Sequence, residues 1–247
     1  MSPGAIYVFA MQLPLGPDPR TETLRRVQAA LIARFGRIIR PEGKRRPPEW
    51  VLVHGVIGAQ TKTAASNAST DGLLAEFGSW EAVAAVPVGD LEARLKRQTF
   101  PKVAAQRLND CLNAIIAERG SVDLRHLSNL DLEDAMAWLE RLPGVARKNS
   151  AGVMNASSFA RKVMVIDGHH RRIMQRMGIV AAKADTARTF GALMPVVPDE
   201  WSAADMDEHH LLLKKLGQTY CRPRRPECAE CPVRSDCETG TGSPLAR

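Results

Sequence analysis

The sequence has no long apolar run and no clear strand pattern. No segment of the 247 residues reaches the roughly 18 consecutive apolar residues that a membrane-spanning helix requires, so the sequence predicts no such helix. Residues 5–15 are mildly apolar but lack a preceding positive region and a small-residue cleavage site. A secretory signal peptide is therefore not predicted.

Cysteine is scarce before the C-terminal region. The total of five is odd, which argues against the disulfide framework of a secreted protein. Cys111 lies in an apolar helical stretch, and we expect it to be a buried small side chain. The other four cysteines all lie within the last 27 residues.

The charge balance is basic. Lys and Arg total 34 against 27 Asp and Glu, for a net charge of +7. Such a balance favours a polyanionic partner, but by itself it does not choose among nucleic acid, a membrane surface and an acidic protein.

Apolar residues recur at helical spacing along most of the chain, and this predicts an all-α fold. A basic, proline-containing segment at residues 37–48 is predicted to be a linker. The run that follows it is apolar on all sides, and this predicts a buried helix. The predicted helices are residues 21–35, a helix from residue 49, 70–77, 79–86, 90–97, 101–119, 131–142, 147–158, 185–193 and 203–216.

The helix at residues 131–142 is amphipathic, with Asp131 as its predicted N-cap, and Pro143 and Gly144 end it. The next helix, from residue 147, is rich in small side chains. The unit is predicted to be helix, tight hairpin, helix. Such a turn leaves N–H groups of the second helix free to bind a phosphate.

Two chemically useful side chains follow this hairpin. Lys148 lies in the first turn of the second helix, where the helix dipole opposes its charge and favours the neutral, nucleophilic amine. An apolar run at residues 163–166 leads to Asp167. Taken singly, Lys148 fits a solvated charge, Asp167 an N-cap and the hairpin a non-specific DNA clamp.

The four C-terminal cysteines have the spacing C-x6-C-x2-C-x5-C, at Cys221, Cys228, Cys231 and Cys237. This predicts a metal or cluster cage. Zinc is the general alternative, although structural zinc sites usually show two short C-x2-C pairs. Three arginines lie between the first two cysteines, and a loop pinned at both ends can contact DNA phosphates at a small entropic cost; they are Arg222, Arg224 and Arg225.

The segments LPGVARK and VIDGHHRR resemble the helix-hairpin-helix and catalytic-aspartate motifs of the endonuclease III family of DNA glycosylases. The cysteine spacing matches the [4Fe-4S] loop of that family, and GAQTKT resembles its AQATD segment. This chain departs from the pattern at Ala146, which replaces a hairpin glycine, and at Gly168, which replaces a threonine.

The resemblance implies two helical domains with a DNA-binding cleft between them. Residues 47–160 would form a helical barrel containing the helix-hairpin-helix motif. Residues 1–46 and 161–247 would form a discontinuous domain carrying the [4Fe-4S] cluster. We expect a monomer that is cytoplasmic and associated with the nucleoid, and that binds double-stranded DNA containing damaged bases or abasic sites.

The resemblance also implies roles for individual residues. Lys148 would be the nucleophile, and Asp167 would stabilise the cation that forms at the sugar. Gln60 would enter the space left by the flipped base, although a glutamine that bonds nearby carbonyls at a helix end is the alternative. Phe100 stands where the family has a leucine wedge. The other implied DNA contacts are Gly144, Ala146, Arg147, His169, Arg222, Arg224 and Arg225.

The reaction implied is excision of a damaged base, with an oxidised pyrimidine as the expected substrate, followed by strand cutting through β-elimination. Three alternatives stay open: a monofunctional glycosylase for another lesion, a catalytically silent DNA clamp, and a zinc-dependent nucleic-acid binder. Lys148 argues against the adenine-specific branch, which lacks this lysine.

Overall fold

The computed structural model describes residues 18–41 and 43–242, and within these ranges it contains helices and no strand. The all-α prediction is confirmed. The α-helices are α1 (Pro19–Phe35), α2 (Pro48–Ile57), α3 (Thr63–Phe77), α4 (Trp80–Ala84), α5 (Val88–Arg94), α6 (Pro101–Arg119), α7 (Leu132–Glu140), α8 (Arg147–Ala156), α9 (Gly168–Met177), α10 (Thr186–Leu193), α11 (Ala203–Thr219) and α12 (Glu238–Thr241). Short 3-10 helices are η1 (Arg125–Asn129), η2 (Met194–Val196) and η3 (Arg234–Asp236).

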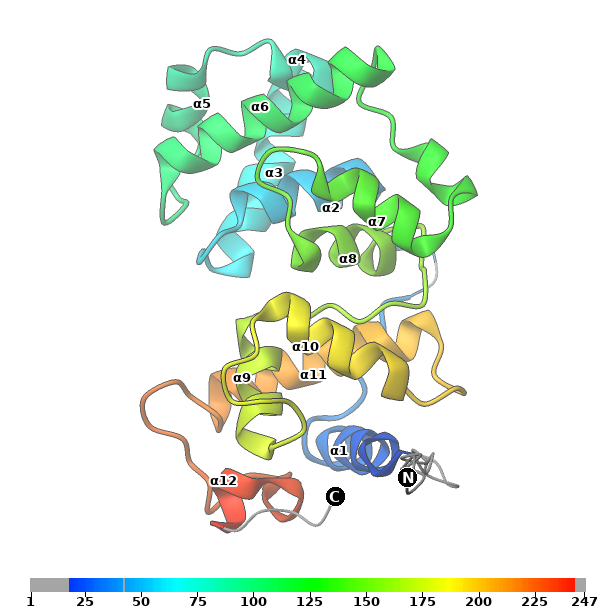
Figure 1. Cartoon of the computed structure of the whole chain (residues 1–247). Coiled ribbons are helices and arrows are strands. Elements are labelled where there is room, and N and C mark those ends of the chain that lie inside the picture. The colour runs from blue at the N-terminus through cyan, green and yellow to red at the C-terminus, as the bar shows by residue number, and fades with distance from the viewer. Residues whose placement is uncertain (1–17, 42, 243–247) are drawn as a thin grey trace, which may run out of the picture.

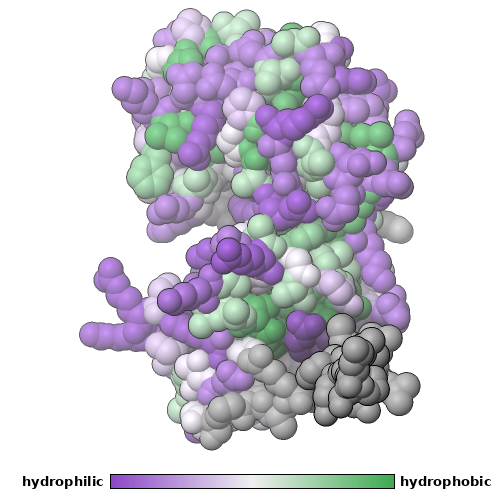
Figure 2. Space-filling view, viewed as in Figure 1, coloured by the Kyte–Doolittle hydropathy of each residue, from purple (hydrophilic) through white to green (hydrophobic). Residues whose placement is uncertain are grey.

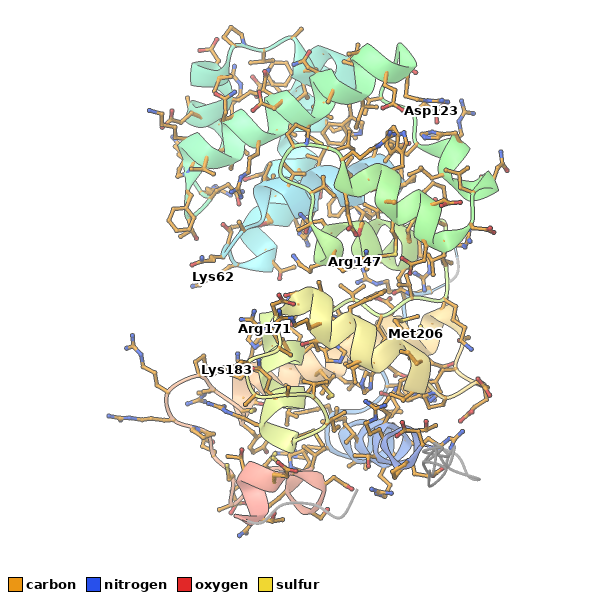
Figure 3. The ribbon with its side chains drawn as sticks, in the orientation of Figure 1. Lys62, Asp123, Arg147, Arg171, Lys183 and Met206 are labelled. Atoms are coloured by element: carbon orange, nitrogen blue, oxygen red, sulfur yellow. The ribbon has the colours of Figure 1, made fainter. Side chains whose placement is uncertain are left out.

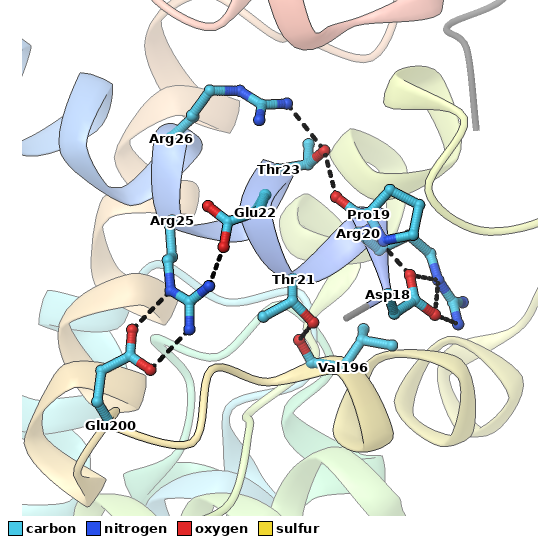
Figure 4. Close-up of polar contacts among 10 residues, drawn as sticks. All are labelled: Asp18, Pro19, Arg20, Thr21, Glu22, Thr23, Arg25, Arg26, Val196 and Glu200. Carbon is cyan, nitrogen blue, oxygen red and sulfur yellow. Dashed lines mark hydrogen bonds and ion pairs between the residues drawn. The ribbon is translucent and has the colours of Figure 1, made fainter. Parts of the chain in front are cut away.

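Helix α1 starts two residues before the predicted position because its first turn is capped. The carboxylate of Asp18 accepts the backbone N–H of Arg20 at 2.9 Å, and Pro19 occupies a position where its missing N–H costs nothing. Thr21 then donates a hydrogen bond to the carbonyl of Val196 at 3.0 Å, as Figure 4 shows. The first helix is therefore fastened to the C-terminal part of the chain.

Helix α3 starts at Thr63, seven residues before the predicted residue 70. Its inward face is partly polar, since Ser66, Ser69 and Thr70 are buried, and this hides the apolar periodicity. The Thr70 hydroxyl satisfies itself within the helix by donating to the carbonyl of Ser66 at 2.8 Å. Asp131 occupies the N-cap position of α7 as predicted, but its side chain makes no capping hydrogen bond.

The helices form two groups, which Figure 1 shows one above the other. In the first group, α2 packs against α3, α6 and α8. In the second group, α11 packs against α9 and against α1, which comes from the other end of the chain. Helix α8 also contacts α10 and α11, so it lies where the two groups meet.

The predicted basic linker connects α1 to α2, and two of its arginines pair with buried acids of α11. Arg40 Nε donates to Asp207 Oδ2 at 2.6 Å, and Arg37 Nε donates to Glu208 Oε1 at 3.0 Å. Asp207 and Glu208 are nearly inaccessible to solvent, so each carboxylate needs its cationic partner. These arginines hold the segment against the second group.

Cys111 is buried in α6, as predicted, and burial raises the pKa of its thiol to about 12. None of the helices in the described ranges is long and apolar enough to cross a membrane.

Removing the buried Asp207 carboxylate should destabilise the fold. Asp207→Ala removes the partner of Arg40 and leaves Arg45, whose side chain is 13% exposed, without an acid, and we expect the free energy of unfolding to fall by about 3 kcal/mol. As a control, Glu76→Ala removes an exposed ion pair with Arg94 and should change the free energy of unfolding by less than about 1 kcal/mol. Urea denaturation measures both. Equal effects of the two substitutions would contradict the importance of the buried pair.

Candidate active site

The hairpin between α7 and α8 tolerates the alanine that replaces its second glycine. Gly144 has φ +79°, and a Cβ there would also lie 3.1 Å from the Arg107 side chain, so glycine is required. Ala146, the N-cap of α8, has φ −122° and ψ 172°, which any residue adopts. The departure at Ala146 therefore leaves the turn unstrained.

The start of α8 offers backbone donors. Its N-cap residue makes no side-chain hydrogen bond, and the N–H groups of Arg147 and Lys148 have no acceptor among the described residues. The Arg147 side chain is occupied instead by Glu133 at 3.1 Å and Glu140 at 3.0 Å. An anion at this position would thus meet backbone N–H groups and the positive end of the helix dipole.

Asp167 caps α9 and still presents a free oxygen. Its Oδ1 accepts the backbone N–H groups of His169 at 2.8 Å and His170 at 2.9 Å. No described residue donates to Oδ2. The N-cap role and an electrostatic role are therefore compatible, because they use different oxygens.

Lys148 and Asp167 lie close enough for their charges to interact. Lost hydration lowers the pKa of the Lys148 ammonium, the charge of Asp167 raises it in part, and that of Lys214 lowers it further. Solvent still reaches Lys148, but the surrounding protein reduces its hydration. The net direction is downward, which favours the neutral amine.

Burial raises the pKa of the Asp167 carboxyl, but the opposing effects of His210 and of the His170 N–H outweigh it, and the net shift is downward. Asp167 is therefore a carboxylate at neutral pH. His210 Nδ1 lies 2.8 Å from the carbonyl of Val165, which can only accept, so Nδ1 carries the hydrogen. This bond fixes His210 beside residues 163–166, which lead into Asp167.

The loop that follows α2 and the loop that precedes α6 are hydrogen-bonded to each other. Thr99 Oγ1 donates to the carbonyl of Gln60 at 2.9 Å, and the Thr99 N–H donates to Thr61 Oγ1 at 3.0 Å. Gln60 is exposed, with a φ of +53° that is uncommon for a non-glycine residue, and its side chain bonds no carbonyl of the described chain. The adjacent Phe100 is 47% exposed, which is unusual for a large apolar side chain.

The surface is hollowed between the two groups of helices, with hydrophilic side chains along the edges of the hollow (Figure 2). Figure 3 shows Lys62 and Arg147 on the upper side, and Arg171 and Lys183 on the lower side. Lys62, Arg171 and Lys183 have no acidic partner among the described residues. These edges therefore suit a polyanion.

The four predicted ligand cysteines, Cys221, Cys228, Cys231 and Cys237, are free thiols that line one cavity. Within residues 18–41 and 43–242, no three side chains are arranged to hold a single metal ion. Four sulfurs around one cavity fit a group larger than one ion, as a [4Fe-4S] cluster is.

Helix α9 holds this cysteine loop. Arg172 Nη2 donates to the carbonyl of Cys221 at 2.7 Å, and Arg176 donates to the carbonyls of Arg222 at 2.8 Å and Pro223 at 2.7 Å. The Arg176 guanidinium also lies 3.2 Å from the sulfur of Cys221. The helix that Asp167 caps therefore positions the cysteine loop as well.

The three loop arginines differ in their surroundings. Arg222 pairs with Glu227 at 3.1 Å, whereas Arg224 and Arg225 are exposed and have no partner among the described residues. Hydrophilic side chains project from this loop beyond the body of the molecule (Figure 2). Arg224 and Arg225 are thus the two loop arginines free to contact another molecule.

The remaining predicted residue, His169, packs against α11. A Cβ at Gly217 would lie 2.4 Å from His169 Nδ1, so glycine there permits the close approach of α9 and α11. By contrast, a Cβ at Gly168 would meet nothing within 4 Å. The departure at Gly168 leaves open space next to Asp167.

Several residues at this site were not predicted from the sequence. Arg172 and Arg176 lie four residues apart on one helix face, a spacing that signals a shared role only once the partner loop is known. His210 and Lys214 also lie four apart, on α11, and reach the site from a helix distant in sequence.

Comparison with known proteins defines the class. Residues 53–198, more than half of the chain, match the model of the HhH-GPD superfamily base excision DNA repair proteins. The chain belongs to this superfamily, and the family resemblance predicted from its motifs is confirmed.

Individual relatives agree with this. Endonuclease III of Bacillus subtilis (strain 168) is 29% identical over 194 residues, covering 78% of this chain and 82% of the relative. A solved covalent intermediate of endonuclease III trapped on DNA has a TM-score of 0.73 at 22% identity, covering 90% of this chain and 97% of that one. A thermostable thymine-DNA glycosylase has a TM-score of 0.70 at 17% identity, covering 91% and 100%. The fold is therefore shared with both endonuclease III and a thymine-DNA glycosylase.

Proposed function

We propose that this chain is a DNA glycosylase with AP lyase activity, which excises damaged bases from double-stranded DNA and then cuts the strand. The observation that carries the proposal is the placement of Lys148, in the first turn of α8, within electrostatic reach of the Asp167 carboxylate at the start of α9. The similarity to endonuclease III supports the same reaction.

The chemistry assigns one step to each side chain. A base inside a duplex is out of reach, so the nucleotide must first flip out of the stack, at a cost of a few kcal/mol. Asp167 then stabilises the positive charge that develops at the sugar as the glycosidic bond breaks. The neutral amine of Lys148 forms a bond to the anomeric carbon, and ring opening gives a Schiff base. Elimination from this imine releases a proton from C2′ to water and breaks the bond between C3′ and its oxygen, so the 3′ phosphate departs.

Other features support the handling of DNA. The free N–H groups at the start of α8 suit a phosphate. The joined loops present Gln60 and the exposed Phe100 at one edge, where Gln60 would fill the space left by the flipped base and Phe100 would act as the wedge.

We propose an oxidised pyrimidine as the substrate class, with a range widened by the open space at Gly168. Duplexes carrying thymine glycol, uracil, an alkylated purine, or adenine opposite oxidised guanine test this choice. We propose further that the protein is a monomer located in the cytoplasm and associated with the nucleoid. Its proposed domains are residues 47–160 and residues 1–46 with 161–247, which the grouping of the helices supports.

Cys221, Cys228, Cys231 and Cys237 are the proposed ligands of a [4Fe-4S] cluster. When bound, the cluster supplies a rigid structural tie for the arginine loop and no part of the bond breaking.

Lys148 is expected to form the covalent intermediate. Lys148→Gln should abolish the adduct that borohydride traps with abasic-site DNA, while binding persists because the phosphate contacts come from backbone N–H groups. Asp167→Asn should slow base release at least about 100-fold, as the loss of an electrostatic stabiliser does. A monofunctional glycosylase would release the base without an adduct, and a silent clamp would release no base; either result for the wild-type protein would overturn the proposal.

The cysteine loop is expected to carry iron and inorganic sulfide in equal amounts after anaerobic purification. Cys237→Ala should lose iron and folded yield together, because cluster binding and local folding are coupled. Cys111→Ala, which changes a cysteine outside the loop, should keep its iron. Zinc in place of iron and sulfide would refute the cluster.

The exposed loop arginines are expected to contact phosphates. The double substitution Arg224→Ala, Arg225→Ala should weaken binding to all duplexes alike and reduce the slope of log K against log salt by about two units. Arg222→Ala should have a smaller effect because Glu227 already pairs with this side chain. Fluorescence anisotropy over a salt series measures the slopes, and an unchanged slope in the double variant would show that the loop is merely solvated.

A further inference from the structure

Lys214 joins the two groups of helices beside the candidate active site. It lies on α11 in the second group, and its Nζ donates a hydrogen bond of 2.7 Å to Thr63 Oγ1. Thr63 is the first residue of α3, in the first group. This one side chain therefore spans the junction at which Lys148 lies.

The charge of Lys214 lowers the pKa of side chains on three different helices. It lowers the pKa of Lys148 on α8, after the lost hydration of the ammonium, which is the largest cause. It also contributes to the lowered pKa values of His54 on α2 and His210 on α11, where burial is the first cause. Lys214 is thus a neighbour of the reacting centre as well as a bridge.

The other groups that face Lys148 do not replace this charge. Burial, followed by the charge of Lys148, lowers the pKa of His54 to about 4, so its ring is neutral at pH 7. His210 has a lowered pKa and is neutral there too. Asp167, at the start of α9, is a carboxylate and favours the protonated form of Lys148.

On α8 itself, the nearest cation is Arg147, whose charge is compensated by Glu133 and Glu140. Lys214 is different because its partner is neutral. The Thr63 hydroxyl holds the ammonium in place without cancelling its charge.

We propose that Lys214 is a further positioning residue of this enzyme, which fastens α11 to the start of α3 and places a second positive charge beside Lys148. The proposal rests on the function proposed above. The positive charge of Lys214 disfavours a second positive charge on Lys148, so the deprotonated amine of Lys148, the form that attacks the sugar, is favoured. Lys214 also offsets the opposite influence of Asp167, which the reaction needs as a carboxylate.

The test is the pH dependence of Schiff-base formation. Full-length protein and a duplex with one abasic site are mixed under single-turnover conditions, cyanoborohydride is added, and the trapping rate is measured from pH 6 to pH 10. The variants are Lys214→Met, which removes the charge, Lys214→Arg, which keeps it, and Thr63→Asp, which neutralises it in place.

Loss of the charge lets the pKa of Lys148 rise toward its ordinary value. The midpoint of the rate profile should therefore move up by about one pH unit in Lys214→Met and in Thr63→Asp, and trapping at pH 7 should slow about tenfold. Lys214→Arg should restore the wild-type midpoint. Lys215→Met is the matched control, since Lys215 lies on the same helix but points to Phe35, and its midpoint should not move.

Thermal unfolding of each variant separates a shifted midpoint from a damaged fold, because damage lowers the amount of active protein without moving the midpoint. An unchanged midpoint in Lys214→Met, with only a shallower salt dependence of binding, would make Lys214 a simple phosphate contact and overturn this inference, while the proposed function stands. Wild-type protein that never traps would overturn both.

Discussion

The attraction between the Lys148 ammonium and the Asp167 carboxylate depends on how α8 is held between the two groups of helices. Lys148 belongs to the first group by sequence and packing, whereas Asp167 begins α9 in the second. The contacts of α8 with α10 and α11 hold the two side chains near enough for their charges to interact. The architecture therefore assembles a site from two halves that each supply one functional group.

Charged side chains hold two further segments in place in the second group of helices. Buried Asp207 and Glu208 hold the segment between α1 and α2 through its arginines, and Arg172 and Arg176 hold the cysteine loop against α9. The charges of Arg37 and Arg40 are cancelled by these acids, whereas Arg172 and Arg176 are held by backbone carbonyls. Lys62, Arg171 and Lys183 at the hollow, and Arg224 and Arg225 in the cysteine loop, have no acidic partner among the described residues.

The all-α class and the helix-hairpin-helix were predictable because each rests on local spacing, whereas the catalytic roles of Lys148 and Asp167 stay predictions. Helix limits were less predictable: α3 starts early because its buried face carries Ser66, Ser69 and Thr70, polar residues that satisfy themselves inside the fold. Lys214 and His210 were missed for another reason. Their roles arise from long-range packing of α11, which no local pattern records.

The central claim is that Lys148 is the amine that bonds to the sugar, and mass spectrometry of the trapped adduct tests it most directly. Wild-type protein reduced on abasic-site DNA is digested, and the peptide carrying the nucleotide fragment is sequenced. The structure predicts the added mass on Lys148 alone. Attachment to Lys214, to Lys62 or to the N-terminal amine instead would contradict the account.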